Sequence, residues 1–237
     1  MNASDRKVAI VTGGSQGIGA GVVAEYRRRG WAVVATSRTI RPGGDPDVLT
    51  VEGDVAEPDT ADRIVGAALD TFGRVDTLVN NAGIFIAKPF TEYTETDFAA
   101  MVGVNIAGFF HMTQLAIAEM EKQGSGHVVQ ISTSLVDHAR SESPSALASL
   151  TKGSLNAVTR SLAIEYAKRG IRVNAVALGV IKTPMNPAET YAPLGALHPL
   201  GRMGEISDVI DAILYLESAG FVTGEILHVD GGQSAGH

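Results

Sequence analysis

The chain has 237 residues, of which 45% are hydrophobic and 19% charged, a formal net charge of −7 and no cysteine. This length suits one α/β domain with a full core. The acidic balance without a Lys/Arg run argues against nucleic-acid binding, and the lack of cysteine excludes disulfides and thiol chemistry. The polar segment Met1–Lys7 has no apolar signal core. No segment is expected to approach the ~20 apolar residues that a membrane span needs, so the expected location is cytoplasmic.

Apolar runs alternate with helical patterns along the whole chain. Strands are predicted at Val8–Val11, Ala32–Thr36, Val48–Val51, Thr77–Asn80, His127–Ile131, Arg172–Ala177 and Glu225–Val229. Helices are predicted near Gly17–Arg29, Thr60–Phe72, Thr96–Lys122, Ala146–Lys168 and Ile206–Leu216. Almost wholly apolar strands separated by helices predict a doubly wound α/β fold, with one parallel sheet of about seven strands covered on both faces. The Pro/Gly-rich connection Ser37–Asp47 is too short for a covering helix and predicts a loop.

The first predicted strand runs directly into a glycine-rich loop that opens a helix near Gly17. Glycines at positions 13, 17 and 19 let the backbone turn tightly and let a ligand approach without a Cβ in the way. Backbone amides at the helix start, together with the helix dipole, favour a pyrophosphate. The strand, loop and helix in this order predict a nucleotide-cofactor site.

Further motifs follow in order. They are Thr12–Gly19, Asn80–Gly83, Asn105, Arg172–Val176, Gly179, Thr183–Met185, Val222–Gly224 and Val229–Gly232. In this order they resemble those of the classical short-chain dehydrogenase/reductase family over almost the whole chain. The resemblance implies a Rossmann-type single domain over residues 1–237 that transfers hydride between a nicotinamide cofactor and a small-molecule carbonyl or alcohol. It also implies a homo-oligomer (dimer or tetramer). No metal site is expected, because the six histidines are dispersed and have no paired acids.

The resemblance implies a set of cofactor contacts. They are Gly13, Ser15, Gln16, Gly17, Ile18, Gly19, Ser37, Arg38, Asp54, Val55, Asn81, Ala82, Gly83, Lys152 and Thr183. Ser37 and Arg38 follow the second strand, where a carboxylate would favour NAD and an arginine accommodates a 2′-phosphate. Because Arg38 can make a bidentate contact, NADP(H) is expected; NAD(H) stays possible, since Arg38 could instead be a solvated loop residue. Asp54 could also cap a turn, and Thr183 could cap a helix before Pro184.

The family's catalytic tyrosine is expected four residues before Lys152, where this chain has Ala148. No tyrosine lies between Tyr93 and Tyr166. The remaining catalytic set implied by the resemblance is Asn105, Ser132, Thr133 and Lys152. Thr133 aligns with the family's serine, Ser132 is adjacent to it, and Ser134 is a further possibility.

Several groups could replace the phenol as proton donor. Water could fill the space left by the ring, with Lys152 and Thr133 as its partners. His138 is the best side chain by its ordinary pKa. The weaker alternatives are Asp137, Glu142, Ser145 and Ser149, and His111 is assigned to the core or an interface.

Three functions fit this pattern. The first is an NADP(H)-dependent oxidoreductase with a proton donor other than tyrosine, for which an imine or an activated alkene would also be a suitable substrate. The second is a cofactor-binding isomerase or lyase, and the third is an inactive regulatory protein. A segment around 184–204, with Met185, Tyr191, Leu194, Leu197 and His198, is expected to form an apolar lid over the substrate.

Overall fold

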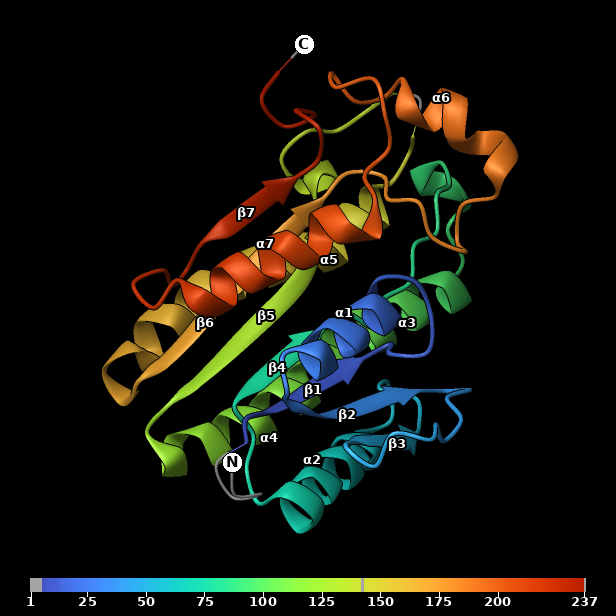
Figure 1. Ribbon diagram of the computed structural model, residues 1–237. Helices are drawn as coiled ribbons and strands as arrows, with labels where there is room; N and C mark the ends of the chain where they lie inside the picture. Colours follow the sequence, from blue (N-terminus) through green and yellow to red (C-terminus); the bar gives the residue numbers. More distant parts are fainter. Residues whose placement is uncertain (1–5, 142, 237) are drawn as a thin grey trace.

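Seven parallel strands form one sheet in the order β3-β2-β1-β4-β5-β6-β7 (Figure 1). The structure is a computed structural model that describes residues 6–141 and 143–236. Glu142, considered above as a proton donor, lies outside the described residues, as do His237 and most of the polar N-terminal segment. The strands are β1 (Val8–Thr12), β2 (Ala32–Ser37), β3 (Val48–Glu52), β4 (Thr77–Asn80), β5 (Gly126–Thr133), β6 (Ile171–Leu178) and β7 (Ile226–Val229). The seven predicted strands are confirmed to within two residues at each end.

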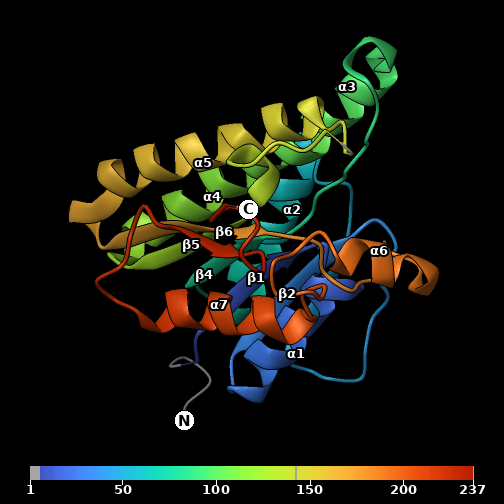
Figure 2. The same ribbon diagram turned by 90° about the horizontal axis from the view of Figure 1, so that it is seen from above.

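Helices cover both faces of the sheet, as Figure 2 shows. They are α1 (Gly17–Arg28), α2 (Pro58–Phe72), α3 (Glu95–Val102), α4 (Gly108–Gln123), α5 (Ala146–Tyr166), α6 (Tyr191–Gly195) and α7 (Ile206–Ser218). Short helical turns are η2 (Phe90–Glu92), η3 (Gly103–Ala107), η4 (Ser134–Val136), η5 (Ala167–Arg169) and η6 (Ala188–Thr190). Helices α2, α4 and α5 lie on one face, and α1 and α7 on the other.

The core is split into two layers by the alternation of side chains along each strand. In β1, Ile10 packs into the layer under α2 and α4, whereas Ala9 and Val11 pack into the layer under α1 and α7. Both layers are buried, so most side chains of the central strands are apolar. This explains the nearly continuous apolar runs that made the strands predictable.

The predicted helix Thr96–Lys122 is one continuous helix, Glu95–Gln123, interrupted by a π-helical turn, η3. It begins with a capping box, in which Thr94 Oγ1 accepts from the Asp97 amide and the Asp97 carboxylate accepts from the Thr94 amide. Among the described residues it is the one helix long and apolar enough to cross a membrane, with a mean hydropathy of 1.4 in its most apolar window, of which 44% is buried. The expectation that no segment has this length and composition was therefore wrong. The buried share and the packing of Met112 and Met120 in the core make it weak evidence for a membrane span.

The connection between β2 and β3 is a loop, as predicted. Arg27 on α1 holds it with a double hydrogen bond to Asp45 and an ion pair to Asp47. No helix of the described chain lies between these strands, and every residue of β3 is half-buried or exposed. The edge of the sheet next to the predicted adenine position is therefore thinly covered.

The chain leaves β1 for β2 on one side, and β4 pairs with β1 on the other side. Ligands of open α/β sheets bind at such a switch point, outside the carboxyl ends of the strands. The glycine loop follows β1, and Asn81–Gly83 follow β4. The topology therefore brings two of the sequence motifs to one place.

Candidate functional site

A cavity of about 550 Å³ runs along the carboxyl ends of the strands. Sixteen of the predicted site residues line it: Gly13, Ser15, Gln16, Gly17, Ile18, Ser37, Arg38, Asp54, Val55, Asn81, Ala82, Gly83, Ser132, Thr133, Lys152 and Thr183. Two predicted residues, Gly19 and Asn105, do not line it. One continuous cavity therefore joins the predicted adenine end to the predicted catalytic lysine.

The glycine loop is shaped by backbone that only glycine adopts readily. Gly13 and Gly17 have φ of 67° and 55°. A Cβ on Gly13 would lie 2.8 Å from Asn81 Nδ2, which donates to the carbonyls of Thr12 (2.9 Å) and Gly13 (3.2 Å). A Cβ on Gly19 would lie 2.1 Å from the Gly13 carbonyl oxygen. Gly19 therefore serves the packing of the helix on the loop, and the other two leave an open cradle at the start of α1.

The adenine end is formed by residues that follow β2 and β3. Arg38 is exposed on the cavity rim, so its guanidinium is accessible to a ligand. Asp54 Oδ1 accepts from the Ala56 amide at 3.0 Å, which confirms the turn-capping alternative, and Asp54 lines the cavity as well. Thr183 also lines the cavity, but no helix begins at Pro184. The alternative role of Thr183 as a helix cap was therefore wrong.

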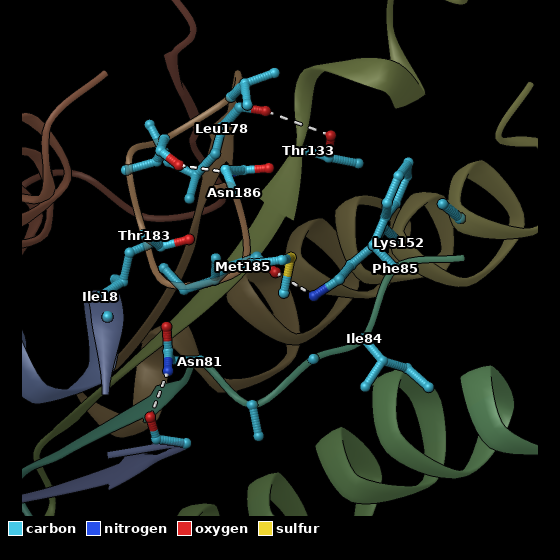
Figure 3. A pocket seen from close by; sticks show the side chains of 18 of the residues that line it. Ile18, Asn81, Ile84, Phe85, Thr133, Lys152, Leu178, Thr183, Met185 and Asn186 are labelled. Carbon is cyan, nitrogen blue, oxygen red and sulfur yellow. Dashed lines mark hydrogen bonds between the residues drawn. The ribbon is translucent and has the colours of Figure 1, made fainter. Parts of the chain in front are cut away.

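Lys152 reaches the cavity from α5. Its Nζ donates to the Ile131 carbonyl at 2.8 Å. A Cβ on Gly83 would lie 2.8 Å from this Nζ, so glycine at position 83 leaves room for the amine. Burial lowers the pKa of the Lys152 amine to about 8. Phe85 and Met185 line the same cavity as Lys152 (Figure 3). A buried amine with this pKa can exchange a proton near neutral pH.

Asn105 is buried in the π-helical turn and holds the segment after β4. Its Oδ1 accepts from the Ile84 amide (3.0 Å), and its Nδ2 donates to the Ile84 carbonyl and to Thr151 Oγ1 (both 3.1 Å). Together with Lys152 it borders a much smaller second cavity. The structure thus places Asn105 behind the site, where it fixes the backbone next to Gly83 and the start of α5.

Three hydroxyl groups at the end of β5 line the cavity. Ser132 and Ser134 are buried: Ser134 Oγ donates to Gln233 Oε1 at 2.9 Å, and Ser132 Oγ makes a long contact to the Lys152 carbonyl. Thr133 is half-buried and donates to the Leu178 carbonyl at 3.3 Å (Figure 3). Thr133 is therefore the hydroxyl most available to a substrate.

Ala148, which the motif alignment places where tyrosine is expected, lines the cavity one turn before Lys152. It packs with Met101 and Leu147. The tyrosines that flank it in sequence do not line the cavity: Tyr93 donates to the Ile86 carbonyl at 2.8 Å, and Tyr166 packs against the core under α2 and α4. No phenol of the described chain therefore lines the wall next to Lys152.

The described side chains considered as a replacement proton donor do not line the cavity either; they are Asp137, His138, Ser145 and Ser149. Asp137 faces His228 Nε2 at 3.0 Å, and Ser149 Oγ donates to the Leu135 carbonyl at 3.1 Å. His138 follows the η4 turn and its amide bonds to the Ser134 carbonyl. His138 was preferred as the proton donor because of its ordinary pKa, but the loop that carries it does not bring it to the cavity wall.

The predicted lid segment contributes Met185, Leu194 and Leu197 to the cavity wall. Tyr191 and His198, expected with them, do not line it. His198 is buried behind the wall, where its Nε2 accepts from the Val180 amide at 3.0 Å and burial lowers its pKa. Nothing in the local sequence indicated that His198 would be buried behind the wall while Leu194, four residues earlier, lines the cavity.

Sequence reasoning missed five polar residues of the cavity, namely Thr39, Arg140, Ser143, Asn186 and Gln233. Arg140 and Ser143 come from the irregular segment before α5, and Gln233 from the segment after β7. These residues lie in irregular segments. The direction of their side chains therefore follows no periodicity or motif that the sequence could show. Among the described residues, no group of three or more His, Asp or Glu side chains is placed to hold a metal ion.

Comparison with known proteins identifies the family to which the chain belongs. A family model described as enoyl-(acyl carrier protein) reductase matches residues 13–234. The chain is 38% identical to cis-4-hydroxycyclohexanecarboxylate dehydrogenase of Sinomonas cyclohexanicum, over 97% of both chains. The chain belongs to the short-chain dehydrogenase/reductase family.

Solved structures of this family have the same fold. ElxO with NADP bound has a TM-score of 0.90 at 31% identity, over 98% of this chain and 100% of ElxO. The 3-ketoacyl-(acyl-carrier-protein) reductase of Brucella melitensis, complexed with NADH, has a TM-score of 0.89 at 32% identity, over 96% of this chain and 98% of the reductase. The chain is an NAD(P)-dependent short-chain oxidoreductase with a Rossmann-type fold, and its cofactor is a nicotinamide dinucleotide.

Proposed function

We propose that the protein is an NADP(H)-dependent oxidoreductase that interconverts a small carbonyl compound and its alcohol, or reduces an imine or activated alkene, without a tyrosine proton donor. The observation that carries the proposal is the buried Lys152 amine, with its pKa lowered to about 8, at the cavity wall next to Ala148. An amine of this kind can take over proton transfer where no phenol is present.

The residues that would hold the cofactor fit a dinucleotide. The glycine loop offers backbone amides at the start of α1 without a Cβ in the way. Arg38 on the rim would bind a 2′-phosphate, and Ser37 beside it adds no negative charge to repel one. Thr183 and Asn81 also line the cavity. These contacts support a preference for NADP(H), with NAD(H) as the weaker ligand.

When bound, the nicotinamide supplies or accepts hydride. The Lys152 ammonium would stabilise the negative charge that builds on a carbonyl oxygen during reduction, and Thr133 Oγ1 would donate a hydrogen bond to the same oxygen. Lys152 would then give the proton, directly or through a water in the space beside Ala148. A donor with a pKa near the working pH is well matched to general acid catalysis, which contributes ~10²–10⁴-fold.

The test separates binding from chemistry. Titration of NADPH and NADH, followed by nicotinamide fluorescence, measures cofactor affinity. Loss of nicotinamide absorbance with a panel of ketones, imines and activated alkenes then measures reduction. We expect NADPH to bind more tightly than NADH and reduction to slow above about pH 8, as Lys152 loses its proton. Cofactor binding without reduction of any member would favour an isomerase, a lyase or an inactive regulatory protein.

We also propose that the protein forms a homo-oligomer, a dimer or tetramer, through α4 and α5. Phe110, Leu150 and Ile164 are exposed on these helices at 53%, 57% and 79%. Burying such side chains would stabilise a subunit contact. Light scattering of wild type and Ile164→Glu would test this, with a fall in mass expected for the variant. The cytoplasmic location is likewise a proposal, which cell fractionation would test.

A further inference from the structure

His198 docks the second half of the lid, residues 194–204, on the body of the protein. It directly follows Leu197, and both Leu197 and Leu194 line the cavity. We propose that His198 is a positioning residue that holds this part of the wall in place only while its imidazole is neutral, so that acid opens the site. The inference rests on the proposed function, because it assigns the regulation of the same site.

The His198 side chain lies in a slot between two glycines. It is 4% exposed, and a Cβ on Gly179 would lie 2.7 Å from its Nε2. A Cβ on Gly231 would lie 3.0 Å from the His198 Cβ. A larger residue at either position would crowd the side chain. The imidazole therefore fits closely between the end of β6 and the segment after β7.

The hydrogen bonds of the ring require the neutral form. Nε2 accepts from the Val180 amide at 3.0 Å, and because a backbone amide can only donate, this nitrogen carries no proton. The proton of the neutral ring is therefore on Nδ1, which donates to the Gly195 carbonyl at 3.4 Å. A second proton, on Nε2, would face the Val180 N–H and break the shorter of the two bonds.

Further hydrogen bonds dock the same half of the lid without titrating. The Leu200 amide donates to the Gly231 carbonyl at 3.1 Å. The Leu197 carbonyl accepts from Gln233 Nε2 at 3.3 Å and from Arg140 Nη2. Backbone amides, carboxamides and guanidinium groups keep their charge between about pH 5 and pH 7. Of these docking groups, the imidazole is the one that titrates in this range.

The charges that face the ring set the direction of the pH dependence. Burial is the largest cause and lowers the pKa of His198; bonds to the backbone and the Asp230 carboxylate raise it, and the Arg140 guanidinium lowers it. The net shift is downward, so a docked lid binds this proton more weakly than a released one. Docking is therefore strongest above the ordinary imidazole pKa of 6.5. It should weaken by up to about tenfold per pH unit below that value.

Hydrogen–deuterium exchange tests the docking without a substrate. Protection factors, which correct for the intrinsic exchange rate, are measured on the full chain at pH 7 and pH 5. We expect protection of the lid peptide 192–200 to fall at least about fivefold between these pH values. Protection of β1 should stay within about twofold, because the core does not open with the lid.

Three variants separate the bond from the bulk of the side chain. In His198→Gln the amide oxygen can accept from Val180 and does not titrate, so the lid should be protected as in the wild type at pH 7 and should keep that protection at pH 5. His198→Leu keeps an apolar volume without the acceptor and should lower protection at both pH values. His228→Gln is the matched control, since His228 is an imidazole on β7 that faces Asp137 Oδ2 at 3.0 Å, and it should leave the acid response unchanged.

The rate of ketone reduction gives a second measurement. In the wild type, kcat/KM should fall between pH 7 and pH 5, mainly through KM, because Leu194 and Leu197 leave the wall. His198→Gln should remove this fall and keep the slower reduction above about pH 8 that Lys152 causes.

The outcomes separate the inference from the proposed function. The inference is overturned by equal lid protection at pH 7 and pH 5 in the wild type, by an acid response that persists in His198→Gln, or by wild-type protection in His198→Leu. Reduction of a ketone with any of these results leaves the oxidoreductase assignment intact. An acid response of the lid that depends on His198, without reduction of any ketone, supports the inference and contradicts the redox function.

Discussion

Restoring a phenol one turn before Lys152 should raise ketone reduction. In Ala148→Tyr, the new side chain starts at the cavity wall, on the same helix face as Lys152, because residues four apart on a helix are neighbours. Its hydroxyl would stand within reach of a substrate oxygen, and the nearby ammonium would lower the pKa of the phenol. In addition to Lys152, the variant therefore supplies a phenolic acid, which the cavity of the native chain lacks among its described residues.

The expected gain in kcat comes from the added acid, whereas overpacking by the ring lowers the stability of the fold. A positioned acid contributes ~10²–10⁴-fold, which corresponds to ~3–5 kcal/mol of activation free energy. Ala148 is 1% exposed and packs on Met101 and Leu147, so the larger ring costs about 1–3 kcal/mol of stability. Because one side of the residue opens on the cavity, the ring can turn into that space. We expect about a 100-fold rise in kcat, with a lower melting temperature.

The assay is NADPH oxidation at 340 nm with saturating cofactor and a panel of ketones. Ala148→Phe is the control, because it adds the same bulk without the hydroxyl. Circular dichroism and NADPH fluorescence establish that both variants fold and bind the cofactor. If the tyrosine and phenylalanine variants fold, bind NADPH and reduce ketones at the same rate, the reasoning about the missing acid is refuted.

Three further predictions concern charge. Lys152→Met should abolish reduction yet raise the free energy of unfolding at pH 7 by up to about 3 kcal/mol, because the folded state disfavours the ammonium form below its pKa of about 8. The gain should shrink between pH 8 and pH 10, and equal urea midpoints of variant and wild type at pH 7 would contradict it. Arg38→Asp should lower the NADPH-to-NADH affinity ratio about 10–100-fold through loss of charged hydrogen bonds, and an unchanged ratio in fluorescence titration would refute the 2′-phosphate contact. Glu217→Ala should cost about 3–5 kcal/mol in urea unfolding, because the carboxylate accepts from Tyr26 (3.0 Å), Thr77 (2.9 Å) and His127 (3.0 Å); a loss below 1 kcal/mol would show that water satisfies these donors.

The layered fold was predictable because its signals are local. The strand Val8–Thr12, for example, is buried on both faces, and four of its five side chains are apolar. Helix α2 has sequence signals at both ends: Pro58 at its start, and Gly73, in the left-handed conformation, at its end. The glycine loop was predictable for the same reason, because the positive φ of Gly13 is a conformation that glycine adopts readily and other residues rarely do.

The rest of the site depends on irregular backbone and was not predictable. The π-helical turn at Asn105 leaves the apolar periodicity of the flanking helices unchanged, so the sequence indicated one regular helix. The segment before α5 decides that Arg140 faces the cavity and that His138 does not. The inward turn of His198 depends on the Val180 amide, eighteen residues away in the chain. Long-range contacts of this kind carry no local signature.

The thin edge at β3 has a consequence for energetics. The strand joins the sheet through β2 alone, and α2 is the helix that packs on it. Its backbone amides should therefore exchange with deuterium sooner than those of β1 or β4, through openings that cost less than global unfolding. A dinucleotide bound across Ser37 and Asp54 would contact this edge of the sheet. Its binding would therefore stabilise β3 against local opening and slow the exchange of its amides.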